Sequence, residues 1–201
     1  MKKILPFFSW LFHPLFIPVF GTLFYLFCNE NYFSAGQKYL ILFQIIIITV
    51  LIPMAFYYLL KTLGKVDSIM VSDLSQRKIP LLIQMVLIFI LLKKSITIDR
   101  IPELFFFMLG GLVSTLLTLL FLFGRIKISI HMIGISALTA FIIGLSLHNQ
   151  ANHLLPIAFL IMINGIIAAS RIYMKAHSMT EIVIGFFAGV IPQLALLYLW
   201  L

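Results

Sequence analysis

The feature that most constrains this chain is a succession of long, continuous apolar runs. Six of them approach or exceed the roughly 20 residues that a helix needs to cross the hydrocarbon core of a bilayer. They cover about residues 7–27, 38–60, 103–124, 130–147, 154–170 and 178–201. Strands of a membrane barrel would alternate polar and apolar residues, whereas these runs do not, so they predict helices. With 63% hydrophobic and 10% charged residues, the chain has too much apolar surface for a soluble domain of its size.

A seventh apolar run, at about 79–92, is shorter than the others and ends before Lys93. It either crosses the membrane or dips in and returns. We therefore predict an all-α integral membrane bundle of six or seven transmembrane helices, with residues 1–201 forming a single membrane domain. A bacterial inner (plasma) membrane is the expected location. The first apolar run follows two lysines, as in a signal peptide, but no small-residue cleavage site follows it, so we expect it to be retained.

Basic residues gather on one side of the predicted bundle. If all seven runs cross, one face carries the N-terminus and the loops at 61–78, 125–129 and 171–177. That face holds ten of the 14 Lys and Arg residues: Lys2, Lys3, Lys61, Lys65, Arg77, Lys78, Arg125, Lys127, Arg171 and Lys175. Such a bias favours the cytoplasmic side. It falls to eight against four when two of the arginines are counted as substrate ligands, which leaves the orientation open.

The net charge of +8 would suggest nucleic acid as a partner of a soluble protein. In a membrane protein it is better explained by helix ends near anionic lipid and by a site for an anionic substrate. We therefore expect membrane lipids and a lipid substrate as partners, and no nucleic acid. The oligomeric state stays open.

Ionisable residues are concentrated near the C-terminal end, where Ser170, Arg171, His177 and Glu181 spell SRxxxxxHxxxE between two apolar runs. Charge is costly within a membrane, so such a cluster indicates a functional site. His177 and Glu181 are four residues apart and share one face of a helix. A carboxylate on one imidazole nitrogen fixes the tautomer and leaves the other nitrogen as a lone-pair nucleophile.

Two further loops on the same predicted face carry residues that fit phosphate chemistry. Arg77 lies three residues before Pro80, and Ser129 and His131 begin the fifth of the seven apolar runs. Arginine forks match phosphate oxygens and neutralise the charge that develops on them. His131, at a helix start, could donate a proton to a leaving group and then activate water. Together the three loops predict phosphoryl transfer through a phosphohistidine, with no metal or cofactor.

These motifs resemble those of the type 2 phosphatidic acid phosphatase superfamily. SRxxxxxHxxxE is similar to its third motif, SRxxxxxHxxxD, and Ser129-Ile130-His131 resembles a reduced form of its second motif, PSGH. The stretch from Arg77 to Pro80 is distantly similar to the first motif, KxxxxxxRP. The resemblance covers about residues 65–185, within a family-like core of about 60–200.

The resemblance implies a role for each matching residue. His177 would be the nucleophile, Glu181 its orienting acid and His131 the general acid and base. Phosphate or substrate would be held by Arg77, Arg171, Ser129, Ser170 and Lys78. The implied protein is a metal-independent membrane phosphatase acting on a lipid phosphate or a polyprenyl diphosphate.

The sequence also departs from the family pattern. Glu181 stands where Asp is usual, Ile130 stands where Gly would expose a backbone N–H, and Met70 occupies the position of the first-motif Lys. These differences favour an alternative: a non-catalytic relative that binds lipid phosphates or scaffolds partners. A small transporter is a third class, although the chain shows no internal repeat and few charges deep in its helices.

Other polar residues have simpler explanations. Asp67 and Asp73 flank a polar loop and could form half of a Mg²⁺–diphosphate site, but a second Asp-rich loop is missing, so a solvated loop is expected. His148 and His153 lie on the opposite face and are expected to be interfacial. His13 precedes a proline, and a helix-start role is expected for it rather than chemistry.

Overall fold

The structure is a computed structural model, and it describes residues 4–28, 32–66 and 74–201. Helices joined by short connections make up the described chain, and these ranges contain no strand. Its elements, in chain order, are α1 (Ile4–Leu11), the 3₁₀ turn η1 (Pro14–Phe16), α2 (Ile17–Phe27), α3 (Ala35–Ile46), the π-helical turn η2 (Ile47–Leu51), α4 (Ile52–Thr62), α5 (Leu74–Lys94), α6 (Pro102–Phe123), α7 (Ile130–His148), α8 (Leu154–Tyr173) and α9 (Met179–Leu197).

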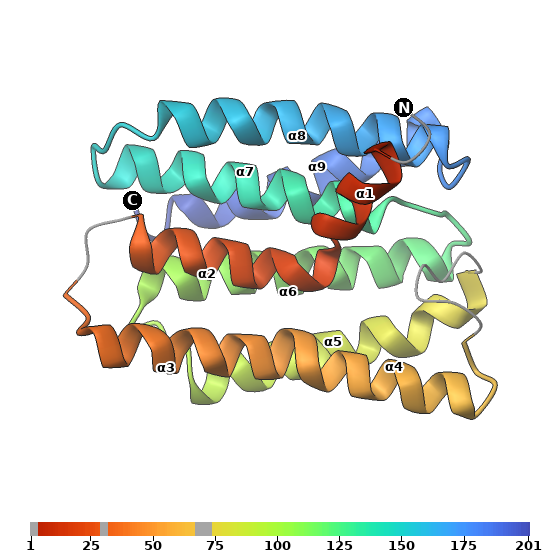
Figure 1. Cartoon of the computed structure of the whole chain (residues 1–201), viewed down its shortest axis with the longest axis horizontal. Helices are drawn as coiled ribbons and strands as arrows, with labels where there is room; N and C mark the ends of the chain where they lie inside the picture. Colours follow the sequence, from red (N-terminus) through yellow and green to blue (C-terminus); the bar gives the residue numbers. More distant parts are fainter. Residues whose placement is uncertain (1–3, 29–31, 67–73) are drawn as a thin grey trace.

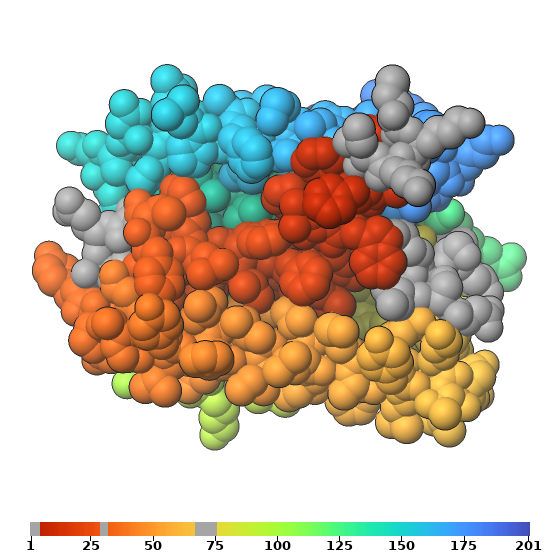
Figure 2. Space-filling model, in the orientation of Figure 1, coloured from red at the N-terminus to blue at the C-terminus, as the bar shows by residue number. Residues whose placement is uncertain are grey.

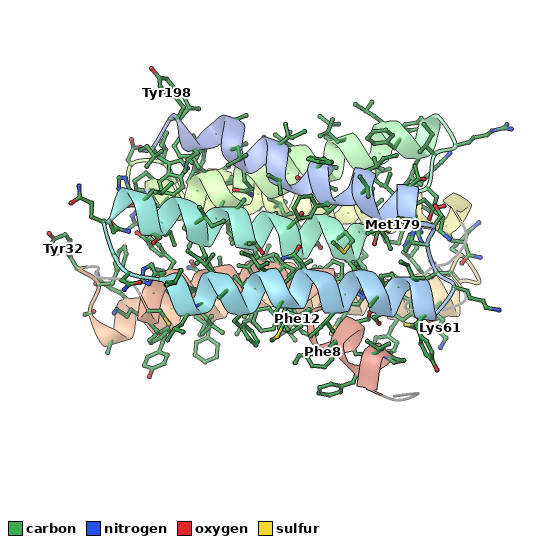
Figure 3. All side chains as sticks on the ribbon, turned by 90° about the horizontal axis from the view of Figure 1, so that it is seen from above. Phe8, Phe12, Tyr32, Lys61, Met179 and Tyr198 are labelled. Carbon is green, nitrogen blue, oxygen red and sulfur yellow. The ribbon has the colours of Figure 1, made fainter. Side chains whose placement is uncertain are left out.

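The chain is an all-α membrane bundle, which confirms the predicted fold class. Six helical stretches of the described ranges are long and apolar enough to cross a membrane. They are Leu5–Phe27, Ala35–Thr62, Pro102–Phe123, Ile130–His148, Leu154–Tyr173 and Met179–Leu197. The helices run along the long axis of the molecule and their connections alternate between its two ends (Figure 1). In Figure 3, Lys61 and Met179 mark one end, and Tyr32 and Tyr198 mark the other.

The short seventh run forms a longer helix than its apolar residues predicted. Helix α5 spans 21 residues and packs along α6. It begins five residues before the apolar run, since its first turns also include the polar residues Gln76, Arg77 and Lys78. Helix α5 is one helix that runs beside α6 and does not turn back within its length (Figure 1), although it is not among the six stretches that are apolar enough to cross a membrane.

The first span is broken near its start by its proline residues. Helix α1 ends at Leu11, and Pro14 and Pro18 lack the N–H groups that a continuous helix would need. His13 caps the turn that follows, because its Nδ1 accepts a hydrogen bond from the Leu15 N–H at 3.3 Å. The break turns α1 away from the axis of α2 and lays it against α8 (Figure 1).

Two glycines on α9 bring it close to α7, the most buried span of the bundle. Gly185 and Gly189 are four residues apart and therefore lie on one face of α9. A Cβ on Gly185 would lie 2.7 Å from the carbonyl oxygen of Ser129, and one on Gly189 would collide with Ile133 and Ser136. Small residues at this spacing let membrane helices approach closely. The contact joins the start of α7 to the start of α9.

Helices α3 and α4 form the lipid-facing edge of the bundle. They run as one continuous band along the lower side of the view in Figure 2, with α1 between that band and α8. Large apolar side chains such as Leu40, Phe43 and Tyr58 are exposed on this band. Only 17% of the apolar stretch of this span is buried, so it faces mainly lipid.

Candidate functional site

The end of the bundle marked by Lys61 and Met179 gathers the three predicted motifs. The first turn of α5 and the connections from α6 to α7 and from α8 to α9 all lie there (Figure 1). Four of the predicted residues, Arg77, His131, Arg171 and His177, line a single cavity of about 330 Å³. Residues up to 100 positions apart in the chain are thus brought together, as the shared face of their loops predicted.

The third motif forms a tight carboxylate–imidazole pair. His177 Nδ1 lies 2.6 Å from Glu181 Oε2, and Ser178 caps α9 by accepting the Glu181 backbone N–H. The His177 side chain is 2% exposed, whereas that of Glu181 is 26% exposed. Because the carboxylate accepts the Nδ1 proton, the lone pair of the imidazole is on Nε2.

The surroundings of His177 favour its neutral form. Its pKa is lowered to about 4, and the largest cause is burial of the ring. The hydrogen bond to Glu181 opposes this shift. The positive charges of Arg77, Arg171 and Lys127 lower the pKa further. At pH 7 the imidazole is therefore neutral and its Nε2 can act as a nucleophile.

The two arginines of the motifs are both buried at the cavity wall. Arg77 is 5% exposed and donates from Nη1 to the carbonyl oxygen of Ile128 at 3.4 Å, which ties α5 to the second motif. Arg171 is 3% exposed and lies at the end of α8 with Nη1 3.8 Å from the sulfur of Met174. Two guanidinium groups lining one buried space create a strongly positive end that suits a phosphate.

His131 is held in place by the N-terminal segment. Its Nε2 lies 3.1 Å from the carbonyl oxygen of Ser9 and donates to it, so the lone pair of this imidazole is on Nδ1. The ring of His13 meets the ring of His131 edge-on, with centroids 5.2 Å apart. His13 also lines the cavity. The sequence predicted only a helix-start role for His13, because nothing in a single sequence indicates a contact between residues so far apart in the chain.

Three predicted substrate ligands have other contacts in the structure. Ser129 caps α7, and its backbone N–H donates to the Glu181 carbonyl oxygen at 3.2 Å. Ser170 is fully buried and contacts the N-terminal segment. The Lys78 Nζ lies 5.1 Å from the centre of the Phe123 ring. None of these three lines the cavity, whose walls lie within the described residues.

The cavity continues from this positive end into an apolar chamber. Its deeper walls include Ile83, Phe107 and Met108. Trp10 of α1 and Tyr58 of α4 also line it, and these side chains are 50% and 55% exposed. The cavity is therefore amphiphilic and reaches the lipid-facing surface between these two helices.

The other polar residues considered in the sequence do not form a further metal site in the described ranges. Within the described ranges, no group of three or more His, Cys, Asp or Glu side chains is placed to hold a metal ion. Asp67 and Asp73, the candidates for a Mg²⁺–diphosphate loop, lie outside those ranges. At the opposite end of the bundle, His148 Nε2 lies 3.6 Å from Glu103, and the ring of His153 packs on Phe24.

No protein-family model, no curated protein and no solved structure matches this chain. The resemblance to the phosphatase superfamily therefore rests on the sequence motifs alone.

Proposed function

We propose that the protein is a membrane phosphatase that hydrolyses a lipid phosphate or a polyprenyl diphosphate through a phosphohistidine intermediate. The observation that carries this proposal is the cavity that His177 shares with Arg77, Arg171 and His131. The imidazole proposed as nucleophile, the two guanidinium groups proposed as phosphate ligands and the imidazole proposed as acid and base line one space, which also has apolar walls.

The first step transfers the phosphoryl group to the protein. The Nε2 lone pair of His177 forms a bond to phosphorus while the bond from phosphorus to the leaving oxygen breaks. Glu181 stabilises the positive charge that appears on the ring. The phosphate group of the bound substrate first gives a proton to the Nδ1 lone pair of His131. His131 then passes this proton to the leaving oxygen, which departs as the lipid alcohol or, from a diphosphate, as the lipid monophosphate.

The second step returns the protein to its starting state. His131 accepts a proton at Nδ1 from a water molecule as the water oxygen attacks phosphorus. The bond between Nε2 and phosphorus breaks, and inorganic phosphate leaves with the proton that His131 held at Nδ1. His131 keeps its Nε2 proton on the Ser9 carbonyl through both steps. The arginines neutralise the charge on the phosphoryl oxygens in both transition states.

A lipid substrate fits the shape of the cavity better than a water-soluble phosphate ester would. The headgroup would lie at the positive end, and the chain would occupy the apolar chamber between α1, α4 and α6. Trp10 and Tyr58, which line the cavity and are about half exposed, would mark a route by which a chain could enter sideways from the bilayer.

Phosphate release from a panel of lipid phosphates, with the purified protein in detergent and a chelator present, tests the proposal. We expect release by the wild type and its loss in His177→Ala. Glu181→Asp is expected to keep much of the activity, because a shorter carboxylate still accepts the Nδ1 proton. Glu181→Ala is expected to lose about 10²-fold or more, since the ring then lacks its orienting charge. Activity that survives His177→Ala would exclude this nucleophile.

A second candidate function is binding of lipid phosphates without turnover. The second motif favours it, because Ile130 replaces a glycine and the Ser129 N–H donates to Glu181 rather than to the cavity. Tight binding of a lipid phosphate by the wild type, with no release of phosphate from any member of the panel, would support this function over the first.

A further inference from the structure

We propose that His13 is a further substrate-binding residue of this site, whose Nε2–H donates a hydrogen bond to an oxygen of the lipid phosphate. The inference rests on the proposed lipid-phosphate site, and it adds the N-terminal segment to the three motif-bearing loops. His13 lines the cavity together with Arg77, Arg171 and His177.

The tautomer of His13 is set by the backbone next to it. Its Nδ1 accepts the Leu15 N–H at 3.3 Å, so the ring proton is on Nε2. No hydrogen bond to a described residue uses that Nε2–H, while the ring lies against the cavity and against His131. A donor that lines a cavity beside two guanidinium groups is placed to bind an anion.

The two imidazoles therefore offer the substrate different groups. His131 donates its Nε2 proton to Ser9 and has its lone pair on Nδ1, whereas His13 uses its lone pair on Leu15 and has its proton on Nε2. His131 can exchange a proton with a leaving group or with water. His13, with its lone pair already bonded, is suited to donate a steady hydrogen bond instead.

A buried hydroxyl network fixes the N-terminal segment over the site. Ser170 Oγ donates to the carbonyl oxygen of Leu5 at 2.7 Å, and Ser9 Oγ lies 2.7 Å from Ser170 Oγ. Ser9 and Ser170 are both fully buried. The serine of the third motif thus positions α1, and through Ser9 it also positions His131. His13 follows directly after α1, so its place at the cavity is a consequence of the same network.

Two substitutions separate the binding role of His13 from its capping role. His13→Asn keeps an acceptor close to the position of Nδ1, and Asn is a good capping residue, but its side chain is too short to reach the position of Nε2. His13→Gln places an amide N–H close to the position of Nε2 and disturbs the cap. A structural role predicts that Gln is worse than Asn, and a binding role predicts the reverse.

The experiment measures equilibrium binding of a long-chain alkyl phosphonate, a non-hydrolysable probe, to the purified full-length variants in detergent. We expect His13→Asn to weaken binding about tenfold or more, as for loss of a hydrogen bond to a charged group, and His13→Gln to restore most of the affinity. Thermal unfolding of each variant reports on the cap. Wild-type affinity in His13→Asn, or weaker binding by His13→Gln than by His13→Asn, would overturn the proposal.

Turnover of a lipid phosphate by the wild type is measured beside binding. Binding that depends on His13 in a protein without turnover would support this inference and overturn the phosphatase. If the wild type turns over a lipid phosphate and the His13→Asn variant binds the phosphonate normally, the phosphatase is supported and the inference about His13 is overturned. If the wild type does not bind the phosphonate, the inference about His13 is overturned.

Discussion

Substitution of Gly185 by alanine tests whether close contact between α7 and α9 builds the site. The new Cβ would lie 2.7 Å from the Ser129 carbonyl oxygen and 3.2 Å from the Ser129 nitrogen. Both are backbone atoms, so no side-chain rotation can relieve the contact. The two helices have to separate by about 0.7 Å to reach an ordinary contact of 3.4 Å.

The magnitude follows from that separation. The hydrogen bond from the Ser129 N–H to the Glu181 carbonyl oxygen is already 3.2 Å long, and the shift would stretch it to about 3.9 Å, beyond hydrogen-bond range. Overpacking of this kind costs about 1–3 kcal/mol. Taking about 2 kcal/mol, the thermal midpoint should fall by about 4–8 °C for a chain of this length. Because a misplacement of about 1 Å can cost 10²-fold in rate, we expect phosphate release to fall about 10- to 100-fold.

Gly165→Ala is the matched control, because a Cβ at Gly165 on α8 has nothing within 4 Å. Alanine is the better helix former by about 1 kcal/mol, so this variant should be as stable as the wild type or slightly more stable. Both variants are compared by thermal unfolding in detergent and by initial rates of phosphate release. A Gly185→Ala protein with wild-type stability and rate would refute the claim that this contact holds the second and third motifs together.

Three further predictions concern charge at the site. Turnover should persist from pH 7 to pH 6 and fall only towards pH 4, because the lowered pKa keeps His177 neutral. A pH–rate profile in which turnover falls with a midpoint near pH 6.5 through protonation of His177 would contradict this. Since the pKa of about 4 in the folded protein lies below the unfolded value of about 6.5, the unfolded chain binds the proton first. Stability from this group is thus present above pH 6.5 and lost as the pH falls towards 4, and thermal midpoints of His177→Asn should show a smaller slope in that window. Arg77→Ala should lower turnover about 10²-fold through loss of a phosphate ligand. Lys78→Ala should leave turnover unchanged, because Lys78 lies over Phe123 outside the cavity. If both variants lose the same amount of activity in a parallel rate assay, the assignment of Arg77 and not Lys78 to the cavity wall is wrong.

Much of this fold can be predicted from hydropathy. Continuous apolar runs dictate membrane helices because each helix satisfies its own backbone hydrogen bonds, and short connections force neighbouring helices to alternate in direction. The same alternation predicts that Arg77, His131, Arg171 and His177 lie at one end of the bundle. The extent of α5 was missed because hydropathy reports the apolar part of a helix, and polar residues such as Gln76 and Lys78 extend it.

The parts of the site that were missed depend on contacts between distant residues. Ser170 looked like a substrate ligand because of its place in the third motif, but its hydroxyl is used by Leu5 and Ser9. His13 looked like a helix-start residue, and it is one, but the break at Pro14 also brings its ring beside His131. Periodicity and spacing describe residues along one helix, and they carry no information about which surface a displaced N-terminal helix will cover.

The most direct test of the central claim is to trap the covalent intermediate. The wild-type protein is mixed with a lipid phosphate labelled in its phosphoryl group, quenched in alkali, which preserves a phosphorus–nitrogen bond, and mapped by peptide. The account predicts one labelled residue, phosphorylated at the Nε2 of His177. Phosphate release without a phosphorylated histidine, or with the label on any other residue, would contradict it.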